Sequence, residues 1–437
     1  MGTEITLEVG GLCVDWGKNS SGANHGMLFQ AHHKKRVRTQ QLDYDCPDLP
    51  DETISSMERA LSAPLKEVKP RLELLGFTLD VVKEEYESVV VEWIDLQSRI
   101  REPDEVFETD ILSFAEFCDF VSNYPVSELD GKYNESGSFQ VTQGRFVSDF
   151  RIQRLPVYAH DIGMAYSELS YFGHLTGFLH PYSYLRVLAE CAENLTADVV
   201  WNYGPVVENG YACESDFIPG AQRKEAFLVA TEGSSDVHII KHALKLLRPE
   251  IQDFFRFIDV SESHPFPGTG NLVKFADGLI KIDIQNNVVF VFDNDAEGFE
   301  AYQRISKMSL LPNMRVMLLP ELAAFRSFLT MGPNGESYAD INRRGAAIEC
   351  YLDLQYDEHP PAKIIWTTYK KELGVYHGAL EYKESYTRSF LKQNHDTLQS
   401  NNYDFSKIAA VLDALIQECF SIKSTENNPG IPSSEYS

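Results

Sequence analysis

Short apolar runs and helical periodicities alternate along residues 221–320. Short, mainly apolar runs occur at 226–231, 255–260, 288–292 and 314–319. The stretches between them, at 237–247, 271–279 and 298–308, repeat their apolar residues with helical spacing. Strands that alternate with helices predict a parallel sheet with right-handed crossovers, and continuous apolar runs are typical of strands covered on both faces.

The segment before this region has a different pattern. Alternating residues at 3–18 and an apolar stretch at 25–30 predict strands. Residues 55–100 predict two or three amphipathic helices, with breaks near Pro70 and Gly76. Further helical stretches at 111–124 and 184–195 make residues 1–220 a mostly helical α+β domain.

The remaining residues mix several patterns. A helix is expected over 343–354, an apolar run covers 362–369, and helices are expected near 385–394 and 407–420. We therefore predict an α/β domain at 221–355, a C-terminal extension at 356–424 and a disordered polar tail at 425–437.

Composition limits the classes of function. The chain has 437 residues, of which 43% are hydrophobic, so it can bury more than one core. Its formal net charge of -26 argues against passive binding to nucleic acid. The seven cysteines show no zinc-finger spacing, and no signal peptide or apolar span is evident, so a cytoplasmic protein without a membrane segment is expected.

Carboxylates follow two of the predicted strands. Glu232 ends the first, and Asp236 falls at the start of the next helix. Asp293 and Asp295 follow the third strand, two positions apart. If these strands are neighbours, about 5 Å apart, the carboxylates converge at the carboxyl edge of the sheet. Converging anions repel unless a cation neutralises them, so we predict a site for Mg²⁺, with Mn²⁺ as the alternative. A capping or turn role is the competing interpretation of either motif alone.

The two motifs, TEGSSD at 231–236 and FDNDAEG at 292–298, resemble those of TOPRIM domains, and their spacing resembles the OLD-like nuclease branch. This resemblance implies a four-stranded parallel TOPRIM sheet flanked by helices. It also implies a further metal-binding carboxylate, Glu349, and a basic catalytic residue, Lys383. The competing interpretation of Glu349 and Lys383 is an ordinary surface charge.

The N-terminal segment departs from OLD-like nucleases. It has no GxxxxGK[ST] motif and so is not their ATPase. Instead, residues 7–19 and 71–79 resemble a domain associated with HEPN and TOPRIM proteins of bacterial conflict systems. A topoisomerase would need a basic DNA-gripping region, and a primase commonly brings a zinc module, and neither pattern is present.

Other candidate motifs are less specific. Arg154 and His160 have the spacing of a HEPN ribonuclease motif, but Pro156 lies between them. The loop PGTGN at 267–271 either approaches a phosphate or forms a simple turn. Residues 341–395 hold eight basic and seven acidic side chains. The residues in this stretch expected to contact nucleic acid are Arg343, Arg344, Lys370, Lys371 and Arg388.

These observations predict a Mg²⁺-dependent endonuclease that cleaves DNA or RNA and acts in anti-phage defence. Glu232, Asp293 and Asp295 would hold one ion, and Asp236 and Glu349 would help to hold a second. The alternative is a regulatory or scaffold subunit that works with a separate sensor or ATPase partner. A second copy of the chain is a further candidate partner.

Overall fold

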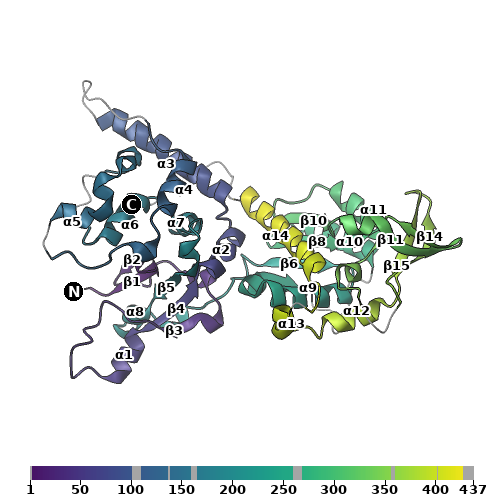
Figure 1. The fold of residues 1–437 in the computed structure, drawn as a ribbon, viewed down its shortest axis with the longest axis horizontal. Helices are drawn as coiled ribbons and strands as arrows, with labels where there is room; N and C mark the ends of the chain where they lie inside the picture. The colour runs from purple at the N-terminus through teal and green to yellow at the C-terminus, as the bar shows by residue number, and fades with distance from the viewer. Residues whose placement is uncertain are drawn as a thin grey trace. The chain divides into compact units, whose positions relative to one another are not determined.

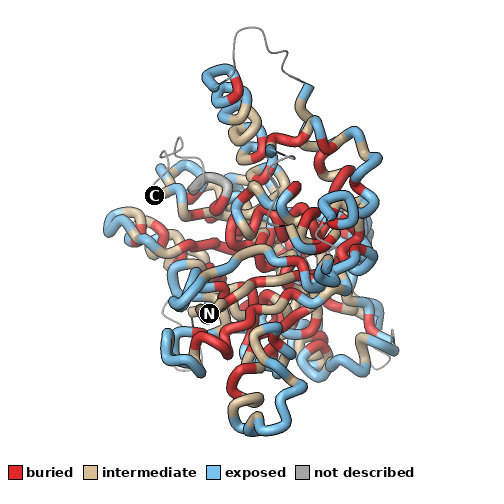
Figure 2. Tube along the Cα trace, turned by 90° about the vertical axis from the view of Figure 1, so that its left-hand side faces the viewer, coloured by how far each residue is buried: buried red, intermediate tan, exposed pale blue. Residues whose placement is uncertain are grey.

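The computed structural model describes residues 2–100, 110–135, 138–158, 165–258, 268–355, 360–400 and 402–426. The chain forms two compact units, Met1–Ala221 and Gln222–Ser437 (Figure 1). Buried segments alternate with exposed ones along the trace in Figure 2, as expected for elements that turn one face to a core. Within the described ranges, the helices are too short or too polar for any of them to span a bilayer.

The first unit is built on a five-stranded antiparallel sheet in the order β2-β1-β5-β4-β3. Alternating burial of Ile5, Leu7 and Val9 in β1 explains why this strand was predictable. The strands are β1 (Glu4–Val9), β2 (Leu12–Lys18), β3 (Lys34–Arg36), β4 (Arg59–Pro64) and β5 (Asp198–Asn202).

The helices of this unit confirm its predicted helical character. They are α1 (Asp51–Met57), α2 (Leu65–Leu74), α3 (Leu79–Ile100), α4 (Phe114–Ser122), α5 (Phe139–Gln143), α6 (Glu168–Thr176), α7 (Pro181–Leu188) and α8 (Gly204–Glu208). The predicted break at Gly76 is confirmed, because this residue has a φ of +97° just after α2. The predicted break at Pro70 is wrong, because α2 continues through it.

Two local predictions in this unit are wrong because tertiary contacts decide the backbone. Residues 26–28 form a 3-10 turn rather than a strand, and a Cβ at Gly26 would lie 2.1 Å from the carbonyl oxygen of Ile218. The predicted helical stretch from residue 55 is interrupted by β4, which pairs with β3 and β5. Both segments were misassigned because pairing partners distant in sequence are invisible to periodicity.

The second unit contains the predicted four-stranded parallel sheet, in the order β10-β8-β6-β7. The fold-class prediction is therefore confirmed. Its strands are β6 (Phe227–Thr231), β7 (Phe255–Phe257), β8 (Asn287–Phe292) and β10 (Met314–Leu318). The helices between them are α9 (Ser234–Leu247), α10 (Thr269–Lys281) and α11 (Ala296–Ser306).

Helices cover both faces of this sheet. On one face α10 and α11 pack on a core that includes Ala230, Val288, Phe290 and Phe292. On the other face α9 contacts β6, and α14 (Ser406–Glu426) contacts α9, β8 and β10. All six residues of β8 are buried, which accounts for the continuous apolar sequence that follows Asn287.

A second sheet in the order β12-β11-β14-β15 extends this unit. Its strands are β11 (Phe328–Gly332), β12 (Gly335–Ala339), β14 (Ile364–Lys370) and β15 (Val375–Leu380), and α12 (Lys383–Phe390) and α13 (His395–Ser400) follow. The C-terminal tail expected at 425–437 lies outside the described residues from 427 onward.

The helix predicted over 343–354 is wrong. Residues Gly345–Ala346 instead form β13, which pairs antiparallel with β9 (Asn294–Asp295). A 3-10 turn, Ile348–Tyr351, comes next, and all four of its residues are buried. Pairing with β9 fixes an extended backbone at Gly345 and Ala346, which overrides the helical spacing of the apolar residues in this segment. The error matters, because this segment carries Glu349.

Candidate metal centre

Glu232 lies immediately after β6, at the carboxyl end of the parallel sheet. Its Oε1 oxygen accepts a hydrogen bond of 3.1 Å from the backbone N–H of Asp293, which follows the neighbouring strand β8. This bond joins the ends of the two strands. Glu232 and Asp293 therefore lie at the same edge of the sheet, and the convergence of all the strand-end carboxylates on one ion stays a prediction.

Asp236 lies in the first turn of α9 and is buried. Its Oδ2 oxygen accepts the backbone N–H of Gly233 at 2.9 Å, and its Oδ1 accepts the hydroxyl of Ser235 at 3.1 Å. These bonds cap the helix, where the dipole favours an anion. The hydrogen bonds of Asp236 thus support a capping role, and its role at a metal site stays a prediction.

Asp293 and Asp295 are also held by backbone donors. Oδ1 of Asp293 accepts the N–H of Ile348 at 2.9 Å. Oδ1 of Asp295 accepts the N–H groups of Glu297 and Gly298 at 2.9 and 2.8 Å, so Asp295 caps α11. Gly298 allows a close approach here, because a Cβ would lie 2.1 Å from the carbonyl oxygen of Asp293.

Glu349 and Lys383 come from outside the sheet. Glu349 is buried in the 3-10 turn after β13, and its charge raises the pKa values of Asp236 and Asp293. Lys383 is the first residue of α12, and its charge acts on Asp236 in the opposite direction. The structure thus places both residues within electrostatic range of the strand-end carboxylates.

The carboxylates perturb one another's ionisation. Burial first, and then the charges of Asp295 and Asp236, raise the pKa of Glu232 to about 9. Burial and the charge of Glu349 raise the pKa of Asp236 to about 6. Although one edge of Asp293 reaches solvent, burial followed by the charge of Asp236 raises its pKa well above the usual range.

This donor set fits a hard divalent cation. It offers only oxygen ligands, and its members repel one another when ionised, which a bound cation would relieve. The residues expected to hold such an ion are Glu232, Asp236, Asp293, Asp295 and Glu349, and their role as ligands stays a prediction.

The residues expected to contact nucleic acid differ in their surroundings. The Nζ of Lys370 lies 2.8 Å from an oxygen of Glu297, at the edge of the carboxylate cluster. Arg343 pairs with Glu321 at 2.6 Å, and the guanidinium of Arg344 stacks on Trp366.

The other two are more exposed. Lys371 and Arg388 both face solvent, and the Nε of Arg388 donates to the carbonyl oxygen of Glu384 at 3.2 Å. Contact of the five basic residues with a phosphate backbone stays a prediction.

Comparison with known proteins identifies the first unit. The family described as HEPN/Toprim N-terminal domain 1 matches residues 1–225, more than half of the chain. The chain belongs to this family. No curated protein and no solved structure matches the chain. Membership of the HEPN/Toprim family, together with the parallel sheet of the second unit, points to a protein of Toprim-type fold that acts on nucleic acid.

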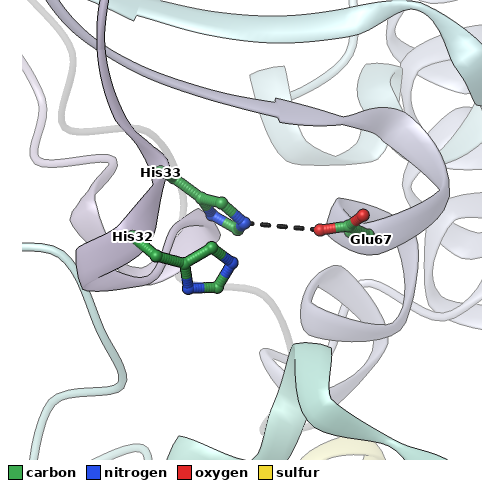
Figure 3. Close-up of side chains that lie close together, drawn as sticks. All are labelled: His32, His33 and Glu67. Carbon is green, nitrogen blue, oxygen red and sulfur yellow. Dashed lines mark ion pairs between the residues drawn. The ribbon is translucent and has the colours of Figure 1, made fainter. Parts of the chain in front are cut away.

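Among the described residues, the side chains whose ligand atoms all lie within 4.8 Å of one another are His32, His33 and Glu67, in the HEPN/Toprim N-terminal domain (Figure 3). No three of the five carboxylates named above lie this close together. The two ring nitrogens of His33 already lie close to other groups of the chain. Its Nδ1 accepts the backbone N–H of Gln30 at 3.0 Å, so the neutral ring carries its proton on Nε2. That nitrogen lies 3.3 Å from Oε2 of Glu67, as the dashed line in Figure 3 marks. A metal on Nε2 would need the proton removed, so these contacts favour a local polar contact between the neutral His33 ring and Glu67.

Two motif candidates acquire no support. Arg154 makes ion pairs with Asp110 and Glu116, and its proposed HEPN partner His160 lies outside the described residues. In the loop 267–271, Pro267 also lies outside the described residues, and Gly268 with a φ of +87° precedes α10 as its N-cap.

One residue near the carboxylates was missed by sequence reasoning. His377 on β15 places its Nδ1 nitrogen 3.7 Å from Oδ2 of Asp295. A single histidine 82 positions after Asp295 gives no motif, and only the packing of β15 brings it here.

Proposed function

We propose that this chain is a divalent-metal-dependent nuclease that hydrolyses phosphodiester bonds of DNA or RNA, with Mg²⁺ or Mn²⁺ as its cofactor. The observation that carries the proposal is the position of Glu232, Asp293 and Asp295 after the neighbouring parallel strands β6 and β8, where Glu232 accepts the backbone N–H of Asp293. We further propose an effector role in bacterial anti-phage defence, on the resemblance of the TEGSSD and FDNDAEG motifs to OLD-like nucleases.

We assign each residue a role in the proposed reaction from its position. Glu232, Asp293 and Asp295 would hold a first ion at the strand ends, and Asp236 and Glu349 would help to hold a second. A bound divalent ion would supply an activated water and neutralise negative charge on the phosphate. Lys383, whose charge lowers the pKa of Asp236, would stabilise charge that develops on the phosphate oxygens.

The test compares cleavage of plasmid, single-stranded DNA and tRNA by the full chain, with EDTA, Mg²⁺ or Mn²⁺. Asp293→Ala stands beside the wild type, because Asp293 is central to the cluster. We expect metal-dependent cleavage by the wild type and a loss of at least about 100-fold in the variant. Equal cleavage by both proteins would overturn the proposal.

A second candidate is a subunit whose site is switched on by a partner. It is favoured by the domain organisation, because the HEPN/Toprim N-terminal domain is a compact unit separate from the unit that holds the carboxylates. A protein that is inert alone and cleaves after addition of a sensor subunit would support this candidate. Full biological activity of the double variant Asp293→Ala, Asp295→Ala would point to a scaffold instead.

A further inference from the structure

The two carboxylate oxygens of Asp295 have different surroundings: one caps α11, and the other faces β15. Oδ1 accepts two backbone N–H groups at the start of α11. Oδ2 faces β15, where Nδ1 of His377 lies 3.7 Å away. A metal on this carboxylate would use the same oxygen, so whatever fixes Oδ2 also fixes the ligand.

The Nδ1 nitrogen of His377 is suited to this role. It is buried and makes no hydrogen bond to any part of the chain that the structure describes. A shift of about 0.5 Å would bring it into hydrogen-bond range of Oδ2. A buried polar atom without a hydrogen-bond partner destabilises the folded protein, and this cost favours a hydrogen bond from Nδ1 of His377 to Oδ2 of Asp295.

His377 is held next to Asp295 by close backbone packing. The backbone N–H of Gly378 donates to the carbonyl oxygen of Arg344, directly before β13, and β13 pairs with β9, which contains Asp295. A Cβ on Gly345 would lie 3.2 Å from the carbonyl oxygen of Gly378, so β13 and β15 approach closely.

The same hairpin makes a second contact with the start of α11. Lys370 on β14 pairs with Glu297 at 2.8 Å. In the register of the hairpin, Lys370 lies opposite Val375, and Val375 is two residues before His377 on the same strand. The side chains of Lys370 and His377 therefore project from the same face of the hairpin. The β14–β15 hairpin therefore reaches the metal centre at two points.

We propose that His377 is a positioning residue of the metal centre, which donates from Nδ1 to Oδ2 of Asp295 and so holds this carboxylate in its ligating orientation. The inference rests on the proposed function for the role of Asp295 as a ligand. It adds the β14–β15 hairpin, which lies outside the four-stranded sheet, to the parts that build the site.

Replacing His377 with asparagine or with glutamine tests whether a donor at the position of Nδ1 is needed, or whether any polar side chain is enough. The amide nitrogen of asparagine stands near the position of Nδ1, whereas that of glutamine stands near the position of Nε2. The test titrates Mn²⁺ into the full chain and measures free Mn²⁺ by electron paramagnetic resonance, for wild type, His377→Asn, His377→Gln and His377→Ala. Tyr376→Ala is the control, because Tyr376 precedes His377 and its ring contacts Tyr369.

We expect His377→Gln and His377→Ala to raise the Kd for Mn²⁺ at least about tenfold, and His377→Asn to stay within about threefold of wild type. Tyr376→Ala should bind as wild type does. If His377→Ala does not fold, the asparagine and glutamine variants decide the question.

A wild-type Kd in His377→Gln, or equal losses in His377→Asn and His377→Gln, would overturn the positioning role. The Mn²⁺ titration also separates the two proposals. Wild-type protein that binds Mn²⁺ and cleaves no nucleic acid would refute the nuclease, while the histidine variants would still decide the role of His377. Equal Mn²⁺ binding by wild type and Asp293→Ala would refute both.

Discussion

Replacing Glu232 with glutamine removes an ionisable carboxyl from the cluster and keeps the shape of the side chain. The amide oxygen can still accept the backbone N–H of Asp293, which Glu232 now accepts at 3.1 Å. We expect this variant to lose metal-dependent cleavage and, without metal, to be more stable than wild type. The two effects have one cause, because the charges that bind a cation repel one another in its absence.

The size of the stability gain follows from the pKa of Glu232, which burial and the charges of Asp295 and Asp236 raise from 4.5 to about 9. At pH 7 the unfolded chain ionises this carboxyl, and the metal-free folded chain must protonate it. Over the interval from 4.5 to 7, at about 1.36 kcal/mol per pH unit, this costs about 3 kcal/mol. Because the folded pKa is the higher one, stability is lost as pH rises from 4.5 towards 9.

The assay is a urea series at pH 5 and pH 7, in EDTA and in Mg²⁺, read by pulsed hydrogen exchange in β6 and β8. These strands report on the second unit alone. In EDTA, Glu232→Gln should gain up to about 3 kcal/mol at pH 7 and less than about 1 kcal/mol at pH 5. Mg²⁺ should stabilise wild type and change the variant much less.

Glu372→Gln is the control, because Glu372 is exposed and its replacement changes the net charge equally. It should leave the urea midpoint unchanged at both pH values. A Glu232→Gln variant with no gain at pH 7, or with the same gain at pH 5, would refute the argument that mutual repulsion destabilises the metal-free site.

Two further predictions concern shape and charge. Gly298→Ala should abolish cleavage and lower the urea midpoint, because its Cβ would lie 2.1 Å from the carbonyl oxygen of Asp293. The control is Gly278→Ala in α10, where an added Cβ would enter open space, and this change should stabilise the chain by about 0.5–1 kcal/mol. Equal effects of the two glycine substitutions would contradict this reasoning. Lys383→Ala should lower the cleavage rate about 100-fold with no change in the urea midpoint, since Lys383 is exposed. Cleavage assays should show Lys392→Ala to be unaffected, and a loss as large as that of Lys383→Ala would indicate a general effect of charge.

The parallel sheet was predictable because burial on both faces leaves a mark in the sequence. The strand β8 is buried along all six residues, and its sequence is apolar without interruption after Asn287. The segment around Glu349 was not predictable in the same way. Its backbone follows the pairing of Gly345 and Ala346 with residues about fifty positions earlier, a contact that no local pattern records.

The residues of the candidate metal centre also differ in how far the sequence predicts them. Glu232, Asp293 and Asp295 could be found because each follows a predictable strand, and parallel strands end at one edge of a sheet. Glu349 was proposed by resemblance, although its predicted helix is absent. His377 gave no signal at all, because its place depends on the close packing of β13 and β15.

The net charge of -26 acquires a specific meaning in this arrangement. A polyanionic substrate would approach a chain that repels it, toward a site whose own carboxylates add to the repulsion. Bound divalent ions would reverse the sign of the field where the phosphate must lie, and Lys370 and Lys383 come from two different segments near the cluster. Metal binding would then control substrate binding as well as chemistry, so a metal-free protein should fail to bind nucleic acid rather than bind it without cleavage.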